Sequence, residues 1–169
     1  ASRSIRPFMD AAEERGLLLL ACDSRAATWD MIHSGYGPDV TFIDRALQQV
    51  FSRYAIDPSR LALDGFSDGA SYALSLGLAN GDLFTHLLGF SPGFLNPAAQ
   101  VGRPQIFISH GTSDRVLPID QCSRVIVSQL QQAGYDPHYV EFEGGHTVPP
   151  QVQQQALNWW LGAAPEGNS

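Results

Sequence analysis

The sequence predicts an α/β fold: a three-layer αβα sandwich around a mainly parallel sheet of about five strands. Short apolar runs alternate with longer segments of helical period, as in βαβ units that place helices on both faces of a sheet. The chain has 169 residues, 44% of them hydrophobic and 16% charged, which suffices for one buried core. We therefore expect a single domain over residues 1–162, followed by a frayed tail over residues 163–169.

Five short apolar runs have the length of a strand, and helical patterns lie before, between and after them. The predicted strands cover residues 17–22, 60–64, 86–90, 105–109 and 138–142. Helices are predicted over residues 4–15, over an apolar stripe at residues 40–54, from residue 67 to about 79, from residue 119 to Gly134, and after the Pro149-Pro150 pair. This alternation is typical of a parallel sheet.

Composition excludes several classes of function. The formal net charge is −7 and no run of Lys or Arg occurs, which argues against a nucleic-acid or anionic-membrane binder. Cys22 and Cys122 match no disulfide framework or metal-ligand spacing, so we expect small core residues. The longest apolar run, residues 17–22, is too short to span a membrane, and no signal peptide precedes it. We expect a soluble, cytoplasmic protein.

A GxSxG motif over residues 65–69 points to a nucleophilic serine. A serine hydroxyl needs a sharp, exposed turn and a base, and the two glycines let a strand and a helix meet at such a turn. The motif alone is weak evidence, but a predicted strand precedes it and a small-residue helix start follows it, as a nucleophile elbow requires. The alternative is an ordinary glycine-rich turn between strand and helix. We predict that Ser67 is a nucleophile.

A histidine and an aspartate follow in the order that a hydrolase needs. His146 lies in a loop after the last predicted strand, where parallel sheets place reactive groups, and it is the favoured base. His110 ends the fourth strand and could also reach the site. Asp114, five residues past that strand, would orient the base; its alternatives are capping a turn or pairing with Arg115.

The chain resembles the phospholipase/carboxylesterase branch of the α/β-hydrolases, which includes acyl-protein thioesterase-like enzymes. The resemblance covers nearly the whole chain and is carried by four motifs: DPSRLALDGFSDG at 57–69, FSPGF at 90–94, HGTSD at 110–114 and GGHTVP at 144–149. It implies ester or thioester hydrolysis through an acyl-enzyme without metal or cofactor, with Ser67 as nucleophile, Asp114 as acid and His146 as base. The competing hypothesis is a weak or inactive hydrolase-like binding protein; a peptidase of the same superfamily is a weaker one.

Two departures from the family pattern concern the oxyanion. The residue after the nucleophile is Asp68, where the family often has Gln; its backbone N–H can still donate, but its carboxylate opposes negative charge unless it points toward the helix N-terminus. The family also has a strand ending in a His-Gly loop that supplies a second N–H, and we find no such segment before residue 17. Either the strands at 17–22 and 60–64 become neighbours, or a homo-oligomer, a partner segment or a missing part of a longer protein completes the sheet.

The substrate pocket is predicted only in outline. Trp29 and Phe94 follow the C-terminal ends of predicted strands and Leu117 lies near Asp114, so all three could line it, with plain packing as the alternative. No bulky lid insertion is visible, which favours a small, short or soluble ester or thioester as the substrate.

Overall fold

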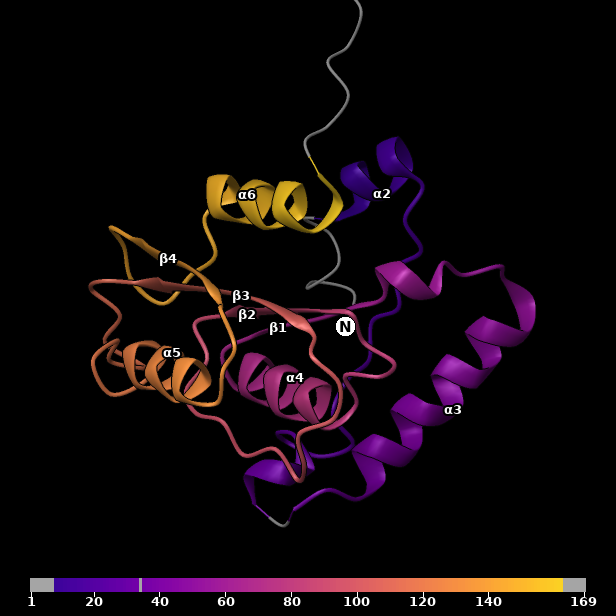
Figure 1. Cartoon of the computed structure of the whole chain (residues 1–169), viewed down its shortest axis with the longest axis horizontal. Coiled ribbons are helices and arrows are strands. Elements are labelled where there is room, and N and C mark those ends of the chain that lie inside the picture. Colours follow the sequence, from indigo (N-terminus) through magenta and orange to yellow (C-terminus); the bar gives the residue numbers. More distant parts are fainter. Residues whose placement is uncertain (1–7, 34, 163–169) are drawn as a thin grey trace, which may run out of the picture. The chain divides into compact units, whose positions relative to one another are not determined.

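The computed structural model describes residues 8–33 and 35–162, which divide into two compact units (Figure 1). One unit holds the described residues up to Ala55 together with Gly162, and contains α2 (Met9–Arg15), η2 (Asp30–Ile32) and α3 (Pro38–Arg53). The other unit is Ile56–Leu161. The expectation of one domain stays a prediction, and the predicted tail lies outside the described residues. None of the described helices is long and apolar enough to cross a membrane.

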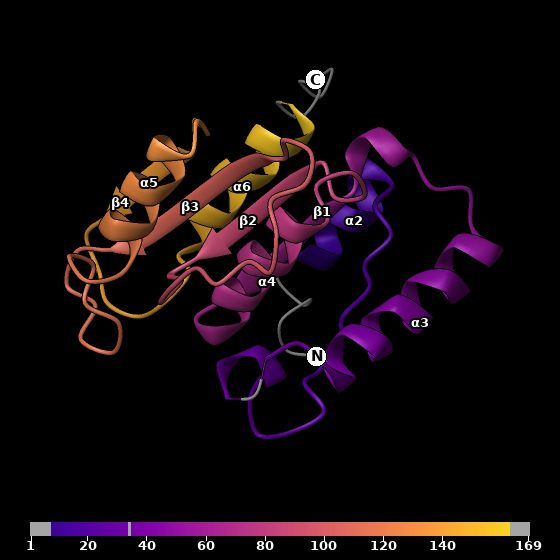
Figure 2. The same cartoon turned by 60° about the horizontal axis from the view of Figure 1, so that its bottom comes forward.

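The second unit is built on a four-stranded parallel sheet. The strands β1 (Ala62–Phe66), β2 (His86–Phe90), β3 (Gln105–Gly111) and β4 (His138–Phe142) lie in this order, each paired with the next. The helices α4 (Asp68–Ala79) and α5 (Ser123–Gln132) cover one face and α6 (Pro150–Leu161) covers the other; η3 (Pro58–Arg60) precedes β1 (Figures 1 and 2). The predicted α/β sandwich is therefore confirmed.

The core of this unit lies between the sheet and α4. Every residue of α4 from Ala70 to Leu78 is buried, and small residues let the helix approach the strands. A Cβ added to Gly77 would lie 2.1 Å from a Leu87 methyl carbon, and one added to Gly89 would lie 2.8 Å from a Leu74 methyl carbon. Such contacts leave no room for a side chain. This close packing fixes the direction in which α4 leaves β1.

The predicted strand at residues 17–22 is wrong, so the sheet has four strands and not five. Residues 17–24 form no strand, and Leu18 and Leu20 remain 42% and 41% exposed. A strand needs a neighbour for its backbone hydrogen bonds, and β1 pairs only with β2 among the described residues. The strands at 17–22 and 60–64 therefore do not become direct neighbours. The outer edge of β1 is left without a partner strand in the described part of the chain.

Helix boundaries shift slightly from the sequence expectation. The helix predicted from residue 119 begins at Ser123, because Gln121 and Cys122 donate their N–H groups to Pro118 and Ile119 in tight turns. Of the helix predicted at residues 4–15, the described part is α2. Cys122 is buried, as predicted, whereas Cys22 is only partly buried.

Candidate active site

Ser67 lies in a strained turn between β1 and α4. Its φ and ψ are 60° and −123°, and a positive φ is rare for a residue with a side chain. A Cβ on Gly65 would lie 2.2 Å from the carbonyl oxygen of Gly69, so only glycine permits this approach. The Ser67 N–H donates to the carbonyl of Phe90 at 2.9 Å, which joins the turn to β2. Such strain persists where the surrounding structure enforces it, and it is common at active sites.

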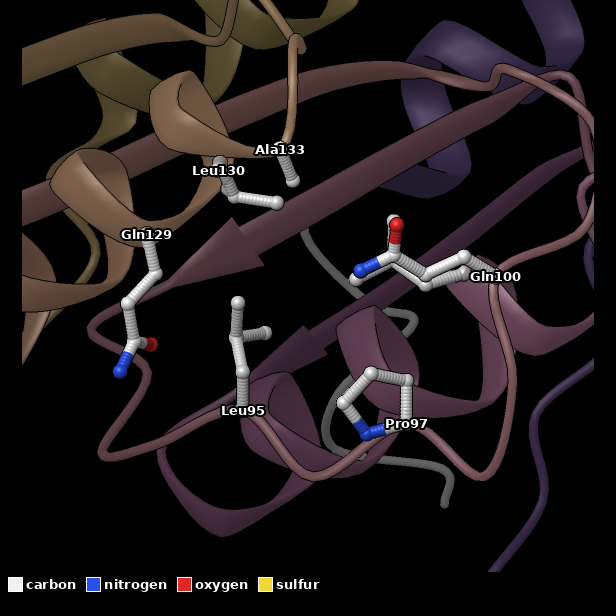
Figure 3. Close-up of a pocket in the computed structure, with 7 residues that line it drawn as sticks. Leu95, Pro97, Gln100, Gln129, Leu130 and Ala133 are labelled. Carbon is white, nitrogen blue, oxygen red and sulfur yellow. The ribbon is translucent and has the colours of Figure 1, made fainter.

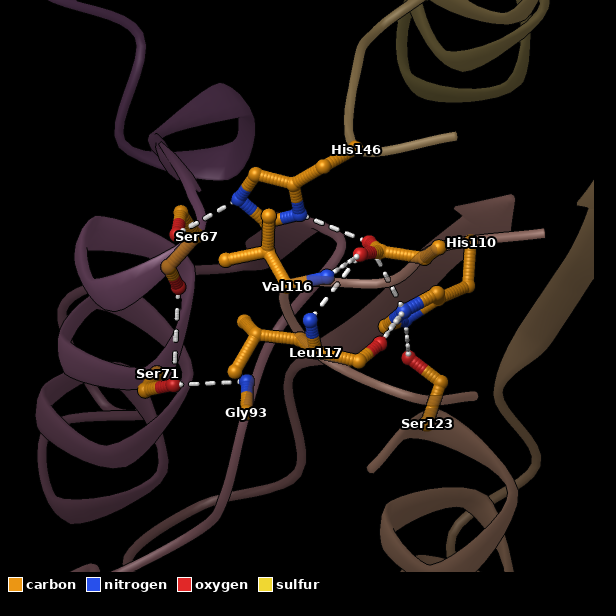
Figure 4. Close-up of polar contacts among 9 residues, drawn as sticks. Ser67, Ser71, Gly93, His110, Val116, Leu117, Ser123 and His146 are labelled. Carbon is orange, nitrogen blue, oxygen red and sulfur yellow. Dashed lines mark hydrogen bonds and ion pairs between the residues drawn. The ribbon is translucent and has the colours of Figure 1, made fainter. Parts of the chain in front are cut away.

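His146 contacts the serine from the loop after β4. Its Nε2 lies 2.9 Å from the Ser67 Oγ, a hydrogen-bond distance at which a neutral imidazole can accept the hydroxyl proton (Figure 4). The ring also packs against Phe66, with centroids 4.7 Å apart. The His146 side chain is 17% exposed, so the pair lies at the surface with access for a small molecule.

Asp114 holds the other side of the His146 ring. Its Oδ2 lies 2.6 Å from Nδ1, and its Oδ1 accepts the N–H groups of Val116 and Leu117, both at 2.9 Å. Burial disfavours the charged carboxylate, but the bonds from Leu117, His146 and Val116 outweigh burial and hold the pKa of Asp114 below its usual range. Asp114 is therefore ionised near neutral pH. It also caps the 114–117 turn, the alternative role that the sequence left open.

Two backbone contacts bring the aspartate and histidine loops together. The N–H of Thr112 donates to Phe142 and the N–H of Ser113 donates to Gly144, both at 2.9 Å. A Cβ on Gly111 would lie 2.4 Å from the carbonyl oxygen of Gly145, so the loops meet at a position that only glycine fits. The 2.6 Å distance between Asp114 and His146 follows from this contact.

His110 lies behind Asp114 and makes no bond to Ser67. Its side chain is fully buried, with Nε2 3.2 Å from the Asp114 Oδ2 and 2.8 Å from the Leu117 carbonyl oxygen. Its Nδ1 lies 2.6 Å from the Ser123 Oγ. The structure thus excludes the role of base that the sequence left open for His110. The HxxxD spacing was visible in the sequence, but nothing there indicated that His110 would contact the aspartate.

Comparisons with known proteins find esterases and a thioesterase among the proteins similar to this chain. Over 136 residues the chain is 30% identical to acyl-protein thioesterase 1 of Eremothecium gossypii, covering 73% of this chain and 55% of that protein. It is 28% identical to a probable feruloyl esterase C of Aspergillus niger, covering 69% of this chain and 43% of that protein. The solved structure of esterase PE8 aligns with a TM-score of 0.63 and 26% identity, over 72% of this chain and 60% of that one. No family model matches the chain.

These similarities support an α/β-hydrolase of the phospholipase/carboxylesterase family. Arabidopsis thaliana SOBER1 shares the fold at 19% identity, with a TM-score of 0.58 over 70% of this chain and 58% of that one. The chain spans about half the length of the curated relatives that it matches.

The three predicted pocket residues, Leu117, Phe94 and Trp29, do not share one environment. Leu117 follows Asp114, and its methyl carbons lie 3.4 and 3.5 Å from where a Gly93 Cβ would be. Phe94 is 38% exposed, and its N–H donates to the Ser71 Oγ, which also accepts from Gly93. Ser71, a buried residue one turn after the nucleophile, was missed from sequence. Trp29 precedes η2 in the other unit. The pocket role of all three stays a prediction.

Other residues line a hollow of about 240 Å³ (Figure 3). Leu78, Leu95 and Leu130 line it, together with Pro97, Ala133 and two glutamines. No titratable or nucleophilic side chain is among the lining residues, so the hollow is no candidate for catalysis. Among the described residues, no group of three or more His, Cys, Asp or Glu could hold a metal ion.

The side chain of Asp68 turns toward the start of its own helix. Its Oδ1 accepts the N–H of Gly69 at 2.8 Å, the orientation in which a carboxylate is favoured by a helix N-terminus. From the sequence we expect Asp68→Gln to raise the acylation rate. This contact keeps the expected gain small, about threefold or less, since the charge already faces the helix. Stopped-flow acylation rates of the two proteins test this; an unchanged or lower rate in Asp68→Gln contradicts the expectation.

Proposed function

We propose that this chain carries the site of a serine hydrolase that cleaves carboxylic esters or thioesters through an acyl-enzyme. The observation that carries the proposal is the continuous series of hydrogen bonds from Ser67 through His146 to Asp114. The strained turn under Ser67 and the ionised state of Asp114 give further support. A nucleophile, a base and an orienting carboxylate at these distances suit acyl transfer.

The reaction would proceed in two halves. His146 Nε2 takes the proton of the Ser67 hydroxyl as its oxygen bonds to the substrate carbonyl carbon, which forms a tetrahedral oxyanion. The oxyanion collapses, the bond to the alcohol or thiol breaks, and the leaving group departs with the proton from His146. Water then attacks the acyl-serine with the same histidine as base, releasing the acid and restoring Ser67. Asp114 stabilises the imidazolium in both halves.

The developing oxyanion needs backbone donors. In this proposal the N–H of Asp68, the first residue of α4, is one of them. The family resemblance assigns the second to a loop after a strand that would lie beside β1, and the outer edge of β1 has no partner strand among the described residues. Loss of one donor costs on the order of 10²- to 10³-fold in rate. A site with one donor alone would suit the second candidate function, a hydrolase-like binding protein with little or no turnover.

The substrate would present an apolar group to the rim of the site. Phe66, Phe94 and Val116 are 40%, 38% and 65% exposed, and each belongs to or adjoins a segment that positions Ser67 or Asp114. Exposed apolar side chains beside a reactive group suit an acyl or aryl ester. The names of the two curated relatives, a thioesterase and a feruloyl esterase, are compatible with this class.

A covalent probe and a simple ester test the proposal together. We expect a fluorophosphonate to label Ser67 in a one-to-one ratio, seen by intact mass and peptide mapping, and p-nitrophenyl acetate to be hydrolysed with a burst of nitrophenol. Boiled protein and the exposed-serine variant Ser128→Ala serve as controls. Labelling without turnover would favour the binding protein, whereas no labelling at Ser67 would refute both functions.

A further inference from the structure

We infer that His110 is a positioning residue for the proposed reaction. Ser123 holds the His110 ring in place, and the ring contacts the Asp114 carboxylate and fixes the orientation in which Asp114 bonds His146. The inference rests on the proposed function. It is carried by a series of short contacts that runs from the N-terminus of α5 through the core to the nucleophile (Figure 4).

The contacts of His110 define which ring nitrogen carries its proton. Nε2 faces the Leu117 carbonyl oxygen at 2.8 Å and the Asp114 Oδ2 at 3.2 Å, and both of these atoms can only accept. Nε2 therefore carries a proton and donates. Nδ1 lies 2.6 Å from the Ser123 Oγ, so in the neutral ring it accepts the proton of that hydroxyl. The direction of donation is Ser123 to His110 to the Leu117 carbonyl, with the Asp114 carboxylate in contact beside it.

This arrangement leaves His110 a single orientation. His110 and Ser123 are both fully buried, and each polar atom of the ring has a partner. Ser123 is the first residue of α5, an element that packs on β3, so the hydroxyl is held by the helix and not by a loop. A ring rotation would face Nδ1 toward the carboxylate and leave buried groups unpaired, which is costly in the interior.

The effect on Asp114 follows from counting its donors. Oδ1 is held by the Val116 and Leu117 N–H groups, which anchor one oxygen only. Oδ2 is bonded to His146 Nδ1 and lies 3.2 Å from the His110 Nε2, whose N–H donates to the Leu117 carbonyl. Without His110, the contact to Oδ2 that remains is His146, the residue that the carboxylate must orient. His110 thus gives the Asp114 carboxylate a contact that does not depend on His146.

The charged groups around His110 do not provide an alternative partner. Glu141 is the register neighbour of His110 on β4, but its carboxylate is held by both guanidinium donors of Arg124 and by the Tyr139 hydroxyl. Arg124 in turn also bonds Asp120. Among the described residues, Asp114 is the carboxylate that lies within 4 Å of a His110 ring nitrogen.

Variants of His110 separate orientation from mere packing. We expect His110→Ala to lower kcat per titrated site by about 10- to 100-fold with KM within about twofold, the range usual for a lost supporting contact. In His110→Gln the side-chain amide can donate at the Nε2 position and accept from Ser123, so kcat should return to within about threefold of the parent. The matched control is His86→Ala: His86 is a buried histidine on β2 that bonds Thr85 and packs on Trp159. It should lose stability without losing kcat per titrated site.

Proton NMR tests the inference without relying on turnover. The Nδ1 proton of His146, in its 2.6 Å bond to Asp114, should give a low-field signal in the parent protein and in His110→Gln. We expect this signal to shift or broaden in His110→Ala and in Ser123→Ala. An unchanged signal in both variants would overturn the inference, whatever their activity. A parent protein that shows the signal and its response but is neither labelled nor active on any ester would instead refute the proposed function.

Discussion

Replacing Ser67 with alanine is expected to abolish fluorophosphonate labelling and to slow hydrolysis of p-nitrophenyl acetate by roughly 10³- to 10⁴-fold. A complete triad loses on the order of 10⁶-fold without its serine, and if this site has one oxyanion donor, as the sequence predicts, it would start about 10²- to 10³-fold lower. Alanine leaves the turn intact, because the Ser67 N–H still bonds Phe90 and its carbonyl still accepts from Ala70 and Ser71. The loss would therefore report on the hydroxyl alone.

Initial rates at saturating ester, corrected for spontaneous hydrolysis, measure this loss. Ser128→Ala, on the exposed face of α5, is the matched control and is expected to keep the parent rate. A Ser67→Ala protein that retains more than about a tenth of the activity would place the nucleophile elsewhere, and the His146 contact to Ser67 would then be structural.

The sequence predicted the four strands that pair in the sheet. It also predicted Ser67, His146 and Asp114, the three residues that the site brings together. Alternation of apolar runs and helical stripes reflects burial on a sheet, and a GxSxG turn reflects the close contact between β1 and α4, so both patterns are local. Four of five strands and the series Ser67–His146–Asp114 follow from such patterns.

The parts that failed depend on contacts that no local pattern records. Residues 17–22 have the composition of a buried strand, yet a strand is completed only by a partner, and none pairs with them among the described residues. The role of His110 was also hidden, because three residues separate it from Asp114 in sequence and the turn at 114–117 brings the carboxylate back to its ring. Ser123 lies on α5, nine residues after Asp114, and nothing in the sequence there indicates that its hydroxyl would bond His110.

Replacing Asp114 with asparagine is expected to lower kcat by roughly 10²- to 10³-fold while fluorophosphonate still reaches Ser67 slowly. A complete triad loses about 10⁴-fold on this change, because the amide sets the wrong histidine tautomer. Here the reason is explicit. The amide oxygen must stay at the Oδ1 position to accept from Val116 and Leu117, so the NH₂ group faces His146 Nδ1. The His146 ring then accepts at Nδ1, carries its proton on Nε2, and can no longer remove the proton of Ser67.

The same amide would also face the Nε2–H of His110, donor against donor, so the variant is expected to be less stable as well. Rates per titrated site, measured from pH 6 to 10 in steps of about one unit, separate the tautomer defect from the loss of stability. With the wrong tautomer the rate rises with hydroxide concentration, because hydroxide removes the serine proton in place of His146. Asp120→Asn, an exposed residue paired with Arg124, is the matched control and should retain the parent kcat. If Asp114→Asn keeps the parent kcat, the carboxylate does no more than cap its turn.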